Sequence, residues 1–187
     1  VRQQFRLERL STTSATFDWD KLNWINRQYM QRHSNEKLAE LIRPFLEDVY
    51  DELPMQKEWL VRVTAVIRDG LNKLEDAVDA AEWAFADNFE VAPDAQEALH
   101  GESARPVLTR LVAELAHVVL LDEATAQSIL QGLRNSFKEN EGWQPTAVFH
   151  PIRAALTGQT DGPPPAQIMA ILGKNRTLQR IANALRL

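Results

Sequence analysis

The sequence predicts an all-α protein built as two consecutive small helical bundles. Three observations support this fold class. Apolar residues recur every three or four positions along most of the chain, which is the spacing of one helix face. Residues that suit helix N-caps, such as Ser34 and Asp122, stand where these stretches begin. Strand signals are nearly absent, because the β-compatible run at 118–121 lies inside a helical period and precedes a helix cap.

The first predicted bundle contains three helices. Ser34 is placed to cap a helix over 35–50, whose apolar stripe runs from Leu38 to Val49. A second helix should begin near Pro54, because proline suits the first helical turn, and should stop near Gly70. The third predicted helix covers about 71–85.

A junction separates the two bundles near residue 92. Asn88 and Pro93 interrupt the helical pattern in the segment FADNFEVAPDAQ. Pro93 can also begin a short helix that reaches His100. Gly142 and Gly158 are placed to end later helices in the left-handed conformation. The remaining predicted helices span 105–120, 122–140, 146–157, 165–172 and 174–186.

Composition excludes several classes of protein. No apolar run approaches the roughly 20 residues that cross a bilayer, and no targeting pattern opens the chain. The sequence has no cysteine, which removes disulfides and thiolate sites and suits a reducing cytoplasm. Its four histidines are scattered without ligand-like spacing, so no metal site is expected. No glycine loop, nucleophile elbow or HExxH pattern indicates a catalytic centre in this chain.

Charge is distributed unevenly along the chain. The net charge of −5 argues against a nucleic-acid partner. However, residues 1–33 carry +3, residues 34–143 carry −12 and residues 144–187 carry +4. Basic ends around an acidic middle could hold a polyanion at defined places. Chance clustering of surface charge explains the same pattern equally well.

The tail holds the most unusual chemistry. After Gly158, a stiff Gly/Pro loop leads into a helix that starts among prolines, so the positive end of that helix faces the loop. Arg153 lies about one turn back on the preceding helix. Such a surface could bind single-stranded RNA, whose bases are recognised when they are unstacked and splayed out. The alternative is a helix–helix corner capped by prolines, and the residues alone favour that alternative.

Several motifs resemble one known family. The tail reads PIRAALTG, QTDGPP, PAQIMAILGKNR and TLQRIANALRL, which is similar to the run P-L-R-x-A-L-T-G, Gly/Pro loop, F-E-[IV]-L-x-L-L-G-K-E-R and amphipathic helix that ends bacterial-type glutamyl-tRNA synthetases. Near the start, FDWDKLNWINRQYMQ resembles the family's F-D-x-x-K-L-x-W-L-N-x-x-Y-I, and AEWAFADNF resembles an aromatic motif in its middle. The chain therefore looks like the anticodon-binding part of such a ligase, without its catalytic half.

The resemblance implies an anticodon-binding helical cage and three segments. Residues 1–33 would end the stem-contact region, 34–92 would form the first anticodon-binding domain and 93–187 the second. Neither ATP signature of class I synthetases is present, so ATP and Mg²⁺ would bind in the missing half and this chain would hold no cofactor. The expected partner is tRNA, and the protein is expected to be a cytoplasmic monomer.

The resemblance also implies the residues that contact tRNA. Lys174 and Arg176 are expected near phosphates. The residues expected at the anticodon are Arg153, Thr157, Gly158, Thr160, Gly162, Pro163, Pro165, Ala166 and Gly70.

Two departures from the family pattern bear on specificity. Ala166 and Gln167 stand where the family often has Phe-Glu, which would change the packing of one anticodon base. Gly70 stands where members that charge only glutamate-tRNA place an arginine that reads the third anticodon base. A non-discriminating enzyme, which also accepts glutamine-tRNA, is therefore expected. Gly70 could also be an ordinary helix end.

A different class of function remains as the alternative. The chain could be a helical protein–protein interaction module whose acidic middle binds a basic partner. Such a module would expose a large apolar patch and would have no RNA role.

Overall fold

The computed structural model describes residues 17–50, 56–86 and 89–187, and every regular element in these ranges is helical. The all-α fold class is therefore confirmed. No helix in this described part is long and apolar enough to cross a membrane. The first group of helices comprises α1 (Trp19–Gln31), α2 (Asn35–Glu47), α3 (Lys57–Ile67), the 3₁₀ turns η2 (Arg68–Gly70) and η3 (Leu74–Asp76), α4 (Ala77–Ala80) and α5 (Glu82–Phe85). The second comprises α6 (Pro93–His100), α7 (Ala104–Ala116), α8 (Glu123–Glu141), α9 (Pro145–Thr157) and α10 (Pro165–Ala184).

Local capping decides where several helices begin and end. The Ser34 side chain accepts a hydrogen bond from the Lys37 amide (3.3 Å), and the Asp122 carboxylate accepts one from the Thr125 amide (2.8 Å). Gly142 and Gly158 close α8 and α9 with φ of 69° and 73°. These four predicted positions are confirmed. The predicted start of the second helix at Pro54 lies outside the described residues.

The predicted helix over 71–85 is wrong, because the segment divides into η3, α4 and α5. Leu71 is extended, with ψ of 129°, and its side chain is fully buried. The Asp76 carboxylate then accepts hydrogen bonds from the amides of Asn72 (2.9 Å) and Lys73 (3.1 Å). A side chain that binds amides in this way offers the backbone an alternative to helix. Ala81, with φ of −104° and ψ of 1°, separates α4 from α5.

Helix α7 ends at Ala116, earlier than the predicted boundary at residue 120. The Lys174 ammonium group donates hydrogen bonds to the carbonyl oxygens of Ala116 (3.1 Å) and Val118 (2.7 Å). A cation at a helix C-terminus satisfies carbonyls that have no amide partner and interacts favourably with the helix dipole. The end of this helix is therefore set by a residue far away in the sequence.

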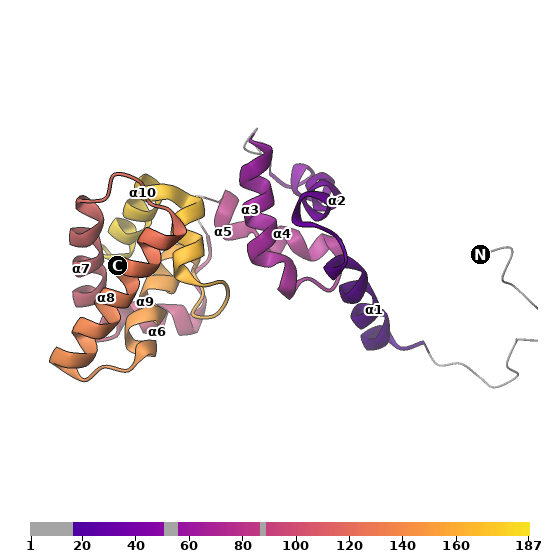
Figure 1. Cartoon of the computed structure of the whole chain (residues 1–187). Helices are drawn as coiled ribbons and strands as arrows, with labels where there is room; N and C mark the ends of the chain where they lie inside the picture. Colours follow the sequence, from indigo (N-terminus) through magenta and orange to yellow (C-terminus); the bar gives the residue numbers. More distant parts are fainter. Residues whose placement is uncertain (1–16, 51–55, 87–88) are drawn as a thin grey trace, which may run out of the picture.

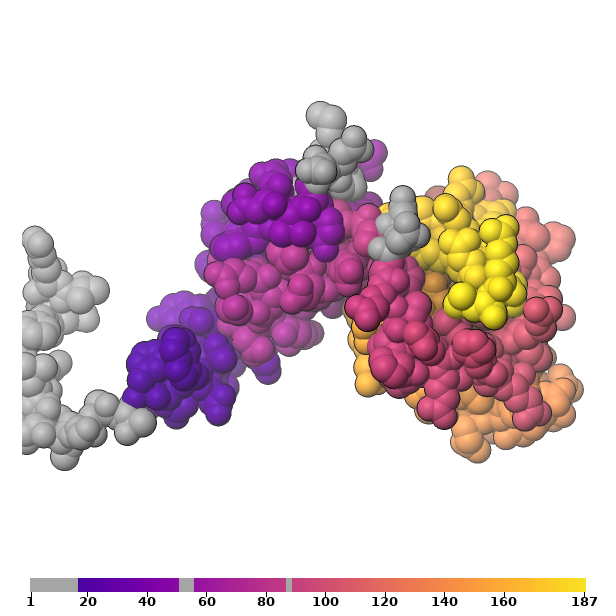
Figure 2. All heavy atoms as spheres, turned by 180° about the vertical axis from the view of Figure 1, so that it is seen from behind, coloured from indigo at the N-terminus to yellow at the C-terminus, as the bar shows by residue number. Residues whose placement is uncertain are grey.

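Helix α9 forms the centre of the second group. Val148, Ile152 and Leu156 are fully buried along it, and α6, α7, α8 and α10 all contact it. Figure 1 shows this group beside the smaller first group, with α1 projecting from the end farther from the second group. Figure 2 shows from behind that the last residues of α10, in yellow, lie next to the segment that enters α6. One continuous apolar cluster spans both groups, and the division at residue 92 stays a prediction.

Helix α10 is interrupted at Gly173, whose φ of 73° and ψ of 170° are not helical. The positive φ is readily adopted only by glycine. The interruption lies between the two predicted helices, 165–172 and 174–186. The second of these ends at Ala184 in the structure.

The close packing around Gly158 gives the first testable prediction. A Cβ at Gly158 would stand 2.4 Å from the Glu90 carbonyl oxygen and 2.7 Å from the Phe89 ring, and φ is positive. We expect Gly158→Ala to lower the free energy of unfolding by about 2–5 kcal/mol, because left-handed strain and a backbone clash add. Urea denaturation measures this loss.

Gly142→Ala is the matched control. Its φ is also positive (+69°), but no atom lies within 4 Å of the built Cβ. We expect a loss of only about 1 kcal/mol, from the strain alone. Equal losses in the two variants would contradict the close approach of Phe89 and Glu90 to Gly158.

Candidate nucleic-acid interface

A cleft of about 550 Å³ lies between the two helical groups. Its lining comes from the end of α3 with η2, from α4 and α5, and from the last residue of α9 with the loop that follows it. The first group contributes Val66, Ile67, Gly70, Asp79, Ala80, Glu82 and Trp83, and the second contributes Thr157, Gln159, Asp161, Gly162 and Pro163. The cleft thus brings predicted residue Gly70 together with three predicted residues of the tail loop.

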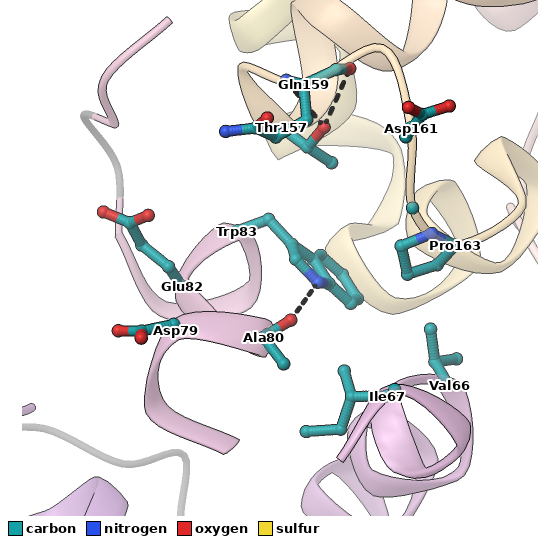
Figure 3. Close-up of a pocket in the computed structure, with 12 residues that line it drawn as sticks. Val66, Ile67, Asp79, Ala80, Glu82, Trp83, Thr157, Gln159, Asp161 and Pro163 are labelled. Atoms are coloured by element: carbon teal, nitrogen blue, oxygen red, sulfur yellow. Dashed lines mark hydrogen bonds between the residues drawn. The ribbon is translucent and has the colours of Figure 1, made fainter. Parts of the chain in front are cut away.

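Trp83 lies at the centre of the lining in Figure 3, between the loop residues Thr157 and Gln159 on one side and Ile67 on the other. Its side chain is largely buried, and its indole Nε1 donates a hydrogen bond to the Ala80 carbonyl oxygen (2.9 Å). That bond fixes the ring as a flat apolar part of the wall. Trp83 belongs to the aromatic motif AEWAFADNF but is not one of the site residues predicted from the sequence.

The tail loop keeps its shape through its own hydrogen bonds. The Thr157 hydroxyl donates to the Arg153 carbonyl oxygen (2.9 Å) and accepts from the Gln159 amide (3.3 Å). Gly162 takes a φ of 116°, which an L-residue with a side chain rarely adopts. These local contacts hold the shape of the loop beside the cleft.

Arg153 braces this loop through two hydrogen bonds to its backbone. Its Nε donates to the Pro163 carbonyl oxygen (3.2 Å), and its Nη1 donates to the Thr160 carbonyl oxygen. Burial lowers the pKa of the guanidinium, and the nearby Asp161 carboxylate opposes that shift. An arginine nevertheless stays protonated at neutral pH. The expected contact between Arg153 and an anticodon base stays a prediction, whereas the bracing of the loop is observed.

Thr160 does not line the cleft. Its hydroxyl donates a hydrogen bond to the Asp94 carboxylate at the start of α6, and its side chain is buried. That hydrogen bond is the main cause that holds the pKa of Asp94 below its ordinary value. Thr160 thus ties the loop to α6.

Five other predicted site residues lie outside the cleft lining. One of them is Gly158, whose backbone packs against Phe89 and Glu90. Pro165 and Ala166 are buried at the start of α10, and Ala166 belongs to the apolar core. The Lys174 ammonium binds carbonyl oxygens at the end of α7, and Arg176 Nη1 donates to the Ala84 carbonyl oxygen (2.8 Å). The expected contacts of these residues with RNA stay predictions.

The lining contains three carboxylates and no basic side chain. Asp79 and Glu82 point to the same side of the cleft, opposite Pro163, in Figure 3. Both side chains are exposed, so they can exchange water for a hydrogen-bond donor at low cost. The cleft is therefore suited to a ligand edge rich in N–H groups, rather than to a phosphate.

The family of the chain follows from a match over most of its length. The family model described as "Anticodon binding domain" matches residues 37–185. The chain belongs to this family. The cleft is thus a feature of an anticodon binding domain.

Curated relatives and solved structures agree with this family. The chain is 31% identical to a glutamate–tRNA ligase of Desulforamulus reducens, and the match covers 100% of this chain and 39% of that protein. It is 34% identical to the glutamate–tRNA ligase of Moorella thermoacetica, with 100% and 38% covered. A crystal structure of a glutamate tRNA ligase from Elizabethkingia meningosepticum, in complex with its amino acid, shares the fold at a TM-score of 0.82 and 19% identity, covering 97% of this chain and 35% of that one. The chain spans well under half the length of the relatives that it matches.

These matches do not favour the alternative of a protein–protein interaction module. The large apolar side chains exposed in the described part are Phe17, Trp19, Trp24, Tyr29, Val49, Val119, Leu120 and Leu187. Four of them belong to α1 and the residues just before it. None of them lines the cleft.

The pair of Thr160 and Asp94 gives a prediction on pH dependence. Because the folded pKa of Asp94 is lowered, the bond stabilises the fold above the ordinary pKa near 3.8, and this contribution is lost as the pH falls through the folded value. Thr160→Val removes the donor, so the pKa of Asp94 should rise toward 3.8. Carbon-13 NMR titration of the side-chain carboxyl measures it.

Asp122 serves as the internal control in the same spectra. Its pKa is also lowered, mainly by the Thr125 hydroxyl, and Thr160→Val should leave it unchanged. An Asp94 titration that does not move in Thr160→Val would show that the hydroxyl is not the cause.

Proposed function

We propose that this cleft binds bases of a tRNA anticodon and that the chain provides anticodon recognition for a glutamate–tRNA ligase. One observation carries the proposal: Gly70 and the loop over 157–163 line the same cleft in an anticodon binding domain. Ligation of glutamate to tRNA with ATP and Mg²⁺ is proposed for a longer protein of which this chain is a part.

The chemistry of the cleft suits an unstacked base. Its volume of about 550 Å³ lies within the roughly 300–1,000 Å³ that small-ligand sites occupy. Val66, Pro163 and the Trp83 indole offer apolar surface for the face of a base. The side-chain amide of Gln159 can form hydrogen bonds with the edge of that base. A base splayed out of the anticodon loop would exchange stacking on its neighbours for these contacts.

A direct binding experiment tests this proposal. We expect the chain to bind a glutamate-tRNA anticodon stem-loop about tenfold more tightly than the same stem-loop with its anticodon replaced. One lost set of base-edge hydrogen bonds is worth about 1–3 kcal/mol. Fluorescence anisotropy at fixed salt measures both affinities, and equal affinities would contradict base reading.

We further propose that recognition is relaxed at the third anticodon base. Glutamate and glutamine codons differ at their first base, which pairs with the third anticodon base. That anticodon base is therefore C in glutamate-tRNA and G in glutamine-tRNA. A guanidinium binds the acceptors of C and meets the donors of G unfavourably. Gly70 supplies no guanidinium, and the exposed carboxylates of Asp79 and Glu82 can accept from the N–H groups of G. Glutamine-tRNA is therefore not penalised.

Introducing the missing guanidinium tests this proposal. No atom lies within 4 Å of a Cβ built on Gly70, and its φ is not in the left-handed range. In the complete ligase, Gly70→Arg should lower kcat/KM for glutamine-tRNA relative to glutamate-tRNA by about tenfold to a hundredfold. Steady-state charging of the two tRNAs measures the ratio.

Gly132→Arg is the matched control. Gly132 also has no atom within 4 Å of its built Cβ, but it lies on α8 and outside the cleft lining. It adds the same charge and should leave the ratio unchanged. If Gly70→Arg also leaves it unchanged, relaxed recognition at Gly70 is wrong.

A further inference from the structure

Two side chains of α3 bind backbone carbonyls of α10 across the boundary between the two helical groups. Trp59 Nε1 donates to the Ile171 carbonyl oxygen (3.2 Å), and Arg62 Nη2 donates to the Ala170 carbonyl oxygen (2.7 Å). Residues three apart lie on the same face of a helix. One face of α3 therefore holds two neighbouring carbonyls of the opposite group.

The interruption at Gly173 explains why these carbonyls need donors. In a regular helix they would accept from the amides of residues 174 and 175. Gly173, with ψ of 170°, lies between the carbonyls and those amides and turns the following backbone away. The segment 165–172 thus ends like a helix C-terminus, where carbonyls without amide partners require other donors.

Two arginines after the interruption donate in the reverse direction. Arg176 Nη1 binds the Ala84 carbonyl oxygen (2.8 Å), and Arg180 Nη2 binds the Ala86 carbonyl oxygen (2.6 Å). Both carbonyls lie at the end of α5, which carries Trp83 of the cleft. The two groups are therefore joined by side-chain bonds that run both ways.

The walls of the cleft belong to different groups. Val66 and Ile67 stand at the far end of α3, roughly 10 Å along the helix from Trp59, and Gly70 follows in η2. The opposite wall is the loop between α9 and α10. The width of the cleft is consequently set by how α3 lies against α10.

We propose that Trp59 and Arg62 are positioning residues that fix the width of the anticodon-binding cleft by tying α3 to the interrupted α10. The role rests on the proposed function only in that the bound ligand is an anticodon. A cleft whose walls are already in place loses less conformational freedom on binding than one that must be assembled. Neither residue lines the cleft, so both act through the placement of Val66, Ile67 and Gly70.

The variants are chosen to remove the donors and keep the packing. Trp59→Phe removes the indole N–H but keeps an aromatic ring against Phe85, whose centroid lies 5.3 Å from that of Trp59. Arg62→Met removes the guanidinium and keeps an apolar stem. Arg43→Met is the matched control, because Arg43 binds Glu47 on the surface of α2. Thermal unfolding of each variant establishes that it is folded.

A distance measurement tests the placement of the two groups without RNA. The chain has no cysteine, so spin labels can be attached at Asp48→Cys in the first group and Asn135→Cys in the second, both exposed positions. We expect one narrow distance distribution in the parent chain and in Arg43→Met. The double variant Trp59→Phe with Arg62→Met should broaden it. An unchanged width in the double variant overturns the proposal.

Binding of the anticodon stem-loop tests the consequence for the ligand. The double variant should bind the stem-loop about tenfold more weakly than the parent chain. Trp59→Phe combined with Arg62→Lys, which keeps a donor at residue 62, should bind more tightly than the double variant. The slope of log affinity against log salt should stay that of the parent chain. A slope reduced by about 0.7–0.9 would mean that Arg62 neutralises a phosphate, and it would overturn the positioning role.

The two experiments separate this proposal from the proposed function. If the parent chain binds no stem-loop but the distance distribution broadens as expected, anticodon binding fails and the tie between α3 and α10 stands. If the stem-loop binds the double variant as tightly as the parent chain, Trp59 and Arg62 do not position the cleft.

Discussion

The hydrogen bonds from Arg153 to the carbonyl oxygens of Thr160 and Pro163 hold the loop that forms one wall of the cleft. The same kind of bond recurs through the second group. Lys174 binds two carbonyls at the end of α7, and Arg180 binds those of Leu156 and Ala86. The bonds of Lys174 and Arg180 supply donors to carbonyls at or just beyond the ends of helices. The placement of the end of α7, of the tail loop and of the end of α5 therefore depends on long cationic side chains that reach between elements.

This use of basic residues changes the meaning of the positive tail. The charge of +4 over residues 144–187 predicted a place to hold a polyanion. In the structure, Arg153, Lys174, Arg176 and Arg180 all bind backbone carbonyls. The cleft itself is lined by carboxylates and apolar groups. Within the described residues, the proposed site thus relies on shape and on base edges more than on phosphate contacts.

Local chemistry made much of the fold predictable from sequence. Ser34 and Asp122 cap through hydrogen bonds to amides three residues away, and Gly142 and Gly158 need only their own backbone freedom. The break-up of the predicted helix over 71–85 was missed, because the Asp76 carboxylate competes there with helical hydrogen bonds.

Features that depend on distant contacts were not predictable from local pattern. The end of α7 depends on Lys174, which lies on α10. For the site, resemblance identified Gly70 and the tail loop separately, but only the packing of α3 on α10 shows that they share a cleft. Trp83 was missed for the same reason, since a tryptophan in an apolar helix pattern gives no sign of which cavity it will line.

The open space around Gly70 bears on how specificity can evolve. No neighbouring atom would resist a side chain at this position, and its backbone conformation is one that ordinary residues adopt. A substitution there would change the chemistry of the cleft with little effect on folding stability, and mutations with that property are not removed by selection for stability. Under the proposed role of Gly70, tolerance for a second tRNA is consequently gained or lost in a single genetic step, without compensating changes elsewhere in the protein.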